Sequence, residues 1–166
     1  MLTSPQLATL KADIAADAAF ASVPMNADGH AFIAAVYALP ANPTYWVWRT
    51  FVSDSEMYEA TSSDATTWSW SIYIARSQAE RDSWRQMVNM RGGINASLAN
   101  TRTGIADIFS GAGGAAQRAH LLALGRRVAT RVEKLFAVGA GTTVSPSVMA
   151  FEGALSGDDV QAARQS

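Results

Sequence analysis

The sequence predicts a mainly α-helical protein, a helical bundle around one long central helix at residues 114–138 with an extended C-terminal arm. Apolar residues recur every three or four positions in several segments, and most clearly in this one. Glycine or proline clusters follow most of these segments, as is typical of helix ends. After Gly141 the helical period is lost. The 166 residues are therefore expected to form a helical bundle domain, 1–141, and a docking arm, 142–166.

Two helices are expected in the first forty residues. Ser4 is a favourable N-cap, and Pro5 suits the first helical position because its missing N–H would be unpaired there anyway. Asp28 is expected to cap a second helix over residues 29–38, which Pro40 ends.

An aromatic cluster follows at residues 45–51 and is compatible with either a helix or a strand. Aromatic rings beside Arg49 could stack on a base or a sugar. We favour a place in the core, because large rings bury much apolar area and no further basic residues lie nearby. Ser53 and Glu56 have the spacing of a capping box and predict a helix start.

The segment from Asp64 to Met90 allows two interpretations. It could form one continuous helix, or a loop that leads into a helix from about Ile72. Residues 61–71 stay unassigned, because their apolar and polar side chains alternate as in a strand. Downstream, Asn100 is expected to cap a helix that Gly111 ends, so that this helix and the central one form an antiparallel or crossed pair.

The central helix rests on the longest stretch with a helical period and no proline. At ~1.5 Å per residue, a helix over residues 114–138 would be roughly 37 Å long. Glycines precede it at 111–113 and follow it at 139–141. Its apolar stripe consists of Leu121, Leu124, Val128, Val132 and Leu135.

The other face of this helix is basic. The candidate partner-binding residues there are Arg126, Arg127, Arg131 and Lys134, of which the last three share one side by spacing. Such a face either is simply solvated, with cations near a helix C-terminus, or binds an acidic partner or DNA. The chain as a whole does not favour DNA, because its formal net charge is −1 and its pI about 6.1.

The C-terminal segment is predicted to be a docking arm. It follows a glycine-rich linker and includes a short apolar piece and a small helix over 156–164. Its candidate partner-binding residues are Val148, Met149, Phe151 and Leu155. These side chains could fold back on the bundle or dock on a neighbouring subunit. Only 16% of residues are charged, against about 25% in typical domains, and this favours the second alternative.

No motif indicates catalysis, a cofactor or a metal, so a non-enzymatic protein is expected. There is no cysteine, and His30 and His120 lack the spacing of a zinc site, so both are expected at the surface or facing a partner. The glycines at 111–114 follow a helix and lack the lysine of a phosphate loop. No apolar run is long enough to cross a membrane, and nothing marks the chain for secretion.

Four segments carry patterns more specific than helix periodicity. They are LTSPQLATLKADIAAD from Leu2, VWRT from Val47, INASLANTRTGIADIFSG from Ile94, and the region 127–164, in which ATRVEKLF is followed by glycines, a proline and FEG. With these segments the chain resembles a family of tailed-bacteriophage and prophage proteins of similar length. The resemblance covers most of the chain, and residues 53–90 depart from it.

This resemblance implies a virion structural protein, and among these a head-to-tail adaptor that forms a ring between portal and tail. It implies that the partners are further copies of the chain, the portal protein and other neck or tail proteins, with passive contact to DNA in a channel. It also implies synthesis in the bacterial host cytoplasm and a final location in the virion neck. Two alternatives stay open: a tail-completion or capsid-associated protein, and a small DNA-handling protein that uses the basic residues.

Overall fold

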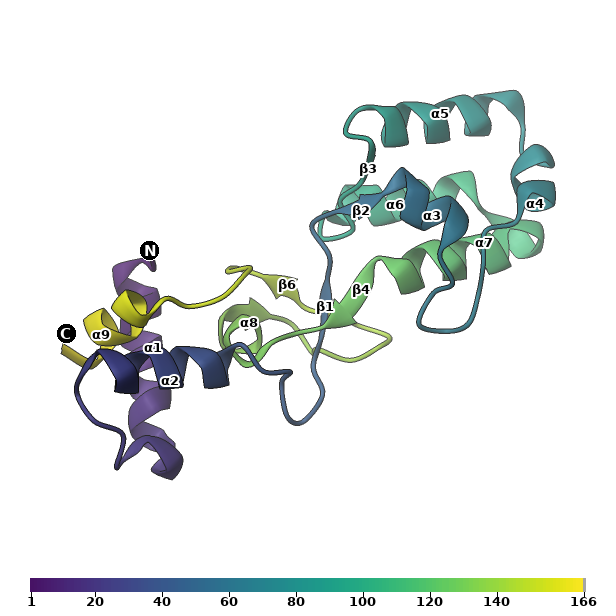
Figure 1. Cartoon of the computed structure of the whole chain (residues 1–166). Coiled ribbons are helices and arrows are strands. Elements are labelled where there is room, and N and C mark those ends of the chain that lie inside the picture. Colours follow the sequence, from purple (N-terminus) through teal and green to yellow (C-terminus); the bar gives the residue numbers. More distant parts are fainter. Residues whose placement is uncertain (166) are drawn as a thin grey trace. The chain divides into compact units, whose positions relative to one another are not determined.

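The computed structural model describes residues 1–165 and is mainly α-helical, as predicted (Figure 1). This part of the chain contains nine α-helices, a 3-10 helix and three two-stranded sheets. It divides into two compact units, each with its own core. Unit 1 comprises residues 1–47 and those from Val128 onward, and unit 2 is the continuous segment 48–127.

Unit 1 is built from helices at both ends of the chain. Its elements are α1 (Ser4–Ala16), η1 (Ala18–Phe20), α2 (Ala27–Tyr37), α8 (Arg131–Phe136), β5 (Ala137–Val138), β6 (Val148–Met149) and α9 (Gly157–Gln165). Leu10, Ile33, Val132 and Val160 are fully buried and bring α1, α2, α8 and α9 around one core. Strand β5 follows α8 directly and pairs antiparallel with β6.

Unit 2 surrounds an aromatic core. Its elements are β2 (Val52–Ser53), α3 (Asp54–Glu59), α4 (Trp70–Ile74), α5 (Gln78–Asn89), β3 (Gly93–Ile94), α6 (Ala99–Ile108) and α7 (Gly111–Leu124). Trp68 lies at the centre and contacts the rings of Trp84 and Phe109. Strands β1 (Trp46–Trp48) and β4 (Arg126–Val128) pair, and the chain passes from one unit to the other within them.

The predicted central helix at 114–138 is wrong. Helix α7 ends at Leu124, the chain is extended at 126–128, and α8 begins only at Arg131. The apolar residues repeat at helical spacing through this segment, but they pack in two different cores. Leu124 belongs to the core of unit 2 and Val132 to that of unit 1.

Local chemistry explains where this segment breaks. A Cβ at Gly125 would lie 2.8 Å from the Ala96 side chain, so only glycine fits this C-cap. Helix α8 then starts with a capping box, in which the Thr130 hydroxyl accepts from the Glu133 N–H and the Glu133 carboxylate accepts from the Thr130 N–H.

Most other helices are near their predicted positions. The capping box of Ser53 and Glu56 is confirmed at the start of α3. Helix α2 is capped by Asn26, two residues before the predicted Asp28. The alternative of one helix from Asp64 to Met90 is wrong, because a loop and two separate helices, α4 and α5, occupy this range.

The C-terminal segment lies on the helices of its own unit. Helix α9 packs beside α1 and α2 (Figure 1), with Leu155 and Val160 in the core. Arg164 also donates to the backbone carbonyls of Val23 and Pro24. Folding back, one of the two alternatives considered for this segment, is therefore present in the single chain; its docking on another subunit stays a prediction. Its last residue, Ser166, lies outside the described residues.

Candidate partner-binding surface

The four basic candidates do not share one helix face. Arg126 and Arg127 lie in β4 on unit 2, whereas Arg131 and Lys134 lie in α8 on unit 1. The expected stripe required a continuous helix, and the break after Gly125 removes it. Each residue therefore has to be considered in its own surroundings.

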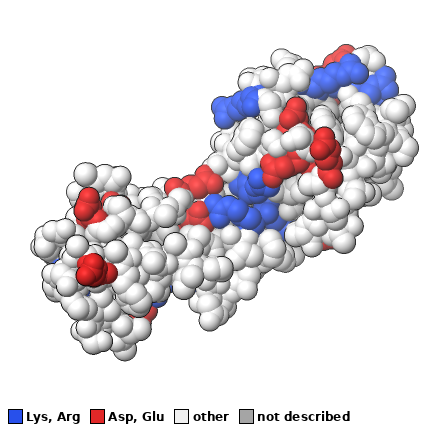
Figure 2. Space-filling view, viewed as in Figure 1, with Lys and Arg blue, Asp and Glu red and all other residues white. Residues whose placement is uncertain are grey.

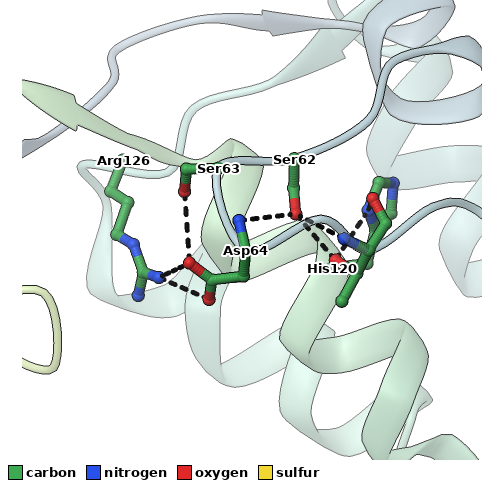
Figure 3. A network of polar contacts seen from close by, with 6 residues as sticks. Ser62, Ser63, Asp64, His120 and Arg126 are labelled. Carbon is green, nitrogen blue, oxygen red and sulfur yellow. Dashed lines mark hydrogen bonds and ion pairs between the residues drawn. The ribbon is translucent and has the colours of Figure 1, made fainter.

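Arg126 is neutralised by an acid of its own unit. Its Nη2 donates to both carboxylate oxygens of Asp64 at 2.6 Å, and most of its side chain is buried (Figure 3). Asp64 lies in a tight loop in which the Ser62 hydroxyl accepts from the N–H groups of Asp64 and Thr66. This ion pair leaves the Arg126 charge largely compensated within the protein.

His120 holds the same loop from the opposite side (Figure 3). Its Nε2 lies 3.0 Å from the carbonyl oxygen of Met57, and its Nδ1 lies 3.1 Å from that of Thr66. His120 is fully buried, and His30 on α2 is buried as well, so the expectation of surface histidines is wrong. Because Ser62 is also buried and both ring nitrogens of His120 are engaged, the group fixes the loop and presents no open nucleophile.

Arg131 is a structural cation at the junction of α8 and α1. It donates to Asp17 at 2.8 Å and to Asp13 at 3.0 Å, and its guanidinium lies 4.4 Å from the Tyr37 ring centroid. The Tyr37 hydroxyl also donates to Asp13. A hydrogen bond from the Ala19 N–H, together with Arg131, lowers the pKa of Asp17. Burial raises the pKa of Tyr37, and the Asp13 carboxylate raises it further.

Lys134 differs from the other cations. Within residues 1–165 it has no carboxylate partner at salt-bridge distance, and its ammonium lies 5.8 Å from the Tyr45 ring centroid. It stands at a groove of about 730 Å³ on unit 1. The groove, called the α2–α8 groove below, is lined by Asp13, Asp17, Val36, Leu39, Pro40, Ala41, Asn42, Arg131, Lys134 and Leu135.

The apolar candidates have unequal exposure. Leu155 is in the core, Phe151 packs edge-on against Phe136, and Met149 is partly buried. Only Val148 is clearly accessible, at 41% exposure. The predicted set is thus brought into one unit, but three of its members are at least partly covered by the protein itself.

Sequence reasoning missed the more exposed neighbours of Val148. Val138 is directly opposite Val148 in the β5–β6 pair and is 75% exposed, and Val144 in the connecting loop is 92% exposed. We call residues 137–149 the valine hairpin. The sequence does contain a signal for this uncharged surface, because no charged residue occurs between Lys134 and Glu152. Charged groups on the face shown in Figure 2 likewise form a few groups separated by broad uncharged surface.

Other kinds of site are not indicated in the described part of the chain. Residues 1–165 contain no group of three or more acidic or histidine side chains that could hold a metal ion. None of the described helices is long and apolar enough to cross a membrane. No family model matches the chain, and neither a curated protein nor a solved structure matches it.

Proposed function

We propose that the protein is a non-enzymatic structural protein of a tailed-phage virion, a head-to-tail adaptor that forms a ring between portal and tail. The observation that carries this proposal is the valine hairpin. It exposes three valines on a stretch without a single charge. Apolar surface of this kind, on a chain with few charged residues, is typical of a protein that is covered by a partner.

The resemblance of four sequence segments to tailed-phage proteins supplies the kind of assembly. Three of these segments correspond to ordered elements: α1, β1 with its flanks, and α6. The fourth, residues 127–164, contains the valine hairpin and most of α9. The proposed contact surface therefore coincides with the most specific part of the resemblance.

The ion pairs weigh against the DNA-handling alternative. Arg126 is held by Asp64, and Arg131 by Asp13 and Asp17. Binding to a nucleic acid backbone depends on cationic side chains that neutralise phosphates and displace the counterions condensed on the nucleic acid. Cations already neutralised by carboxylates of the same unit contribute little to such binding.

Quantitative mass spectrometry of purified phage particles tests the proposal. An adaptor ring predicts a copy number close to that of the portal protein and far below that of the capsid protein. A reconstruction of the particle neck should then contain density for helices of this chain between portal and tail. Detection at capsid-like copy number would favour a capsid-associated protein. Absence from intact particles would contradict the virion assignment altogether.

A further inference from the structure

The valine hairpin is hydrogen-bonded to Tyr45 and Trp46. The Tyr45 hydroxyl donates to the Gly139 carbonyl at 2.9 Å and contacts the Ser147 hydroxyl at 2.7 Å. Trp46 pairs with both arms of the hairpin, donating to Gly141 and accepting from the Ser147 N–H. The Tyr45 ring lies so close to Gly141 that any Cβ there would overlap it. The exposed valines thus stand on a preorganised base, which lowers the entropy cost of binding.

The α2–α8 groove, on the same unit, has complementary properties. Five of its lining residues are apolar, and Leu39 is 58% exposed. Its two acids already neutralise Arg131. An apolar, uncharged occupant fills the groove without disturbing these pairs, and its backbone carbonyls can accept from the Lys134 ammonium.

The valine hairpin meets these requirements. It brings three accessible valines and no charge, and none of its residues lines the groove of its own chain. Hairpin and groove are different patches of one unit. Contact between unlike patches of identical chains is head-to-tail, and such contacts close into rings when the rotation between subunits permits.

We propose that the valine hairpin of one copy docks in the α2–α8 groove of a second copy. This inference rests on the proposed function as a ring-forming adaptor and names the contact that would link neighbouring subunits. It assigns Val138, Val144 and Val148 to one side of the contact, and Leu39 with Leu135 to the other.

Sedimentation velocity of the full chain over a wide concentration range tests the contact. The wild type should associate with rising concentration. Val144→Asp in the hairpin and Leu39→Asp in the groove should each weaken association by about tenfold or more, because each places a charge in an apolar contact. Met90→Asp is the matched control, since Met90 is 76% exposed on unit 2 and should leave association unchanged. Circular dichroism verifies that all variants are folded.

Mixing the two defective variants distinguishes a head-to-tail contact from any other. The Leu39→Asp chain keeps its hairpin and the Val144→Asp chain keeps its groove, so the mixture should form one-to-one dimers that do not grow further. A mixture that stays monomeric would overturn the proposal, as would a wild type that is monomeric at every concentration. Particle mass spectrometry is independent of this result, so failure of the contact and failure of the virion assignment can be told apart.

Discussion

Replacing Thr130 by alanine tests whether α8 is a separate helix. The Thr130 hydroxyl accepts from the Glu133 N–H, whereas the reciprocal bond to the Glu133 carboxylate uses the Thr130 backbone and survives the substitution. Loss of an N-cap of this kind costs about 1 kcal/mol. For a domain of this size, that corresponds to a decrease of roughly 2–4 °C in melting temperature.

The sign of this effect is diagnostic. In a continuous helix over 114–138, Thr130 would be an interior position, where alanine is favoured over threonine by up to ~0.7 kcal/mol. Urea denaturation followed by far-UV circular dichroism measures the difference in unfolding free energy. Thr9→Ala is the control, because Thr9 is exposed inside α1 of the same unit, where helix propensity alone should raise stability by up to ~0.7 kcal/mol. Unchanged or increased stability of Thr130→Ala would refute the proposed helix start.

Three further substitutions probe the same structure. Gly125→Ala should destabilise the protein in thermal melts, since its Cβ would meet the Ala96 side chain at 2.8 Å, although in a continuous helix it would stabilise by ~1 kcal/mol. Val132→Asp should abolish the helical circular dichroism signal of unit 1, because an unpaired buried carboxylate costs several kcal/mol and the total free energy of unfolding of a protein is only about 5–15 kcal/mol. A folded variant would mean that another face of α8 is buried. A hydrogen bond from the Ser53 N–H, aided by Arg49, lowers the pKa of Glu56 below its ordinary 4.5, so the carboxylate stabilises the fold above that pH and this contribution is lost on acidification. Glu56→Gln should therefore be less stable than the wild type at pH 7 and should lose less stability between pH 7 and pH 3. A pH profile of stability that is the same as that of the wild type would contradict this role.

Sequence patterns predicted elements better than their connections. Capping chemistry located α3, because Ser53 and Glu56 interact over three residues and need no tertiary partner. The same box at Thr130 and Glu133 was overlooked, since the apolar period of the surrounding segment continued through it. Apolar periodicity indicates which side chains are buried, but it does not indicate which core buries them. Leu124 belongs to the core of unit 2, whereas Val132 belongs to that of unit 1.

The candidate surface was predictable only in part. Val148 follows from the apolar character of its segment, but Leu155 and Phe151 have the same character and pack inward. Which of these side chains stays exposed depends on how the chain returns to α1 and α2. This path is set by tertiary packing and is not visible in the local sequence pattern. The partial burial of Arg131 between two carboxylates and the rings of Phe20 and Tyr37 likewise depends on residues far away in the sequence.

The discontinuity of unit 1 has a consequence for biosynthesis. Residues 48–127 are continuous and include every element of the unit 2 core, so this core can close while the remaining chain is still on the ribosome. Unit 1 has to wait, because α1 and α2 emerge first but Val132 and Val160, which complete their core, emerge last. At ~5–20 residues per second, the apolar faces of α1 and α2 stay uncovered for several seconds of translation. The N-terminal helices therefore expose their apolar faces during synthesis longer than the helices of unit 2 do.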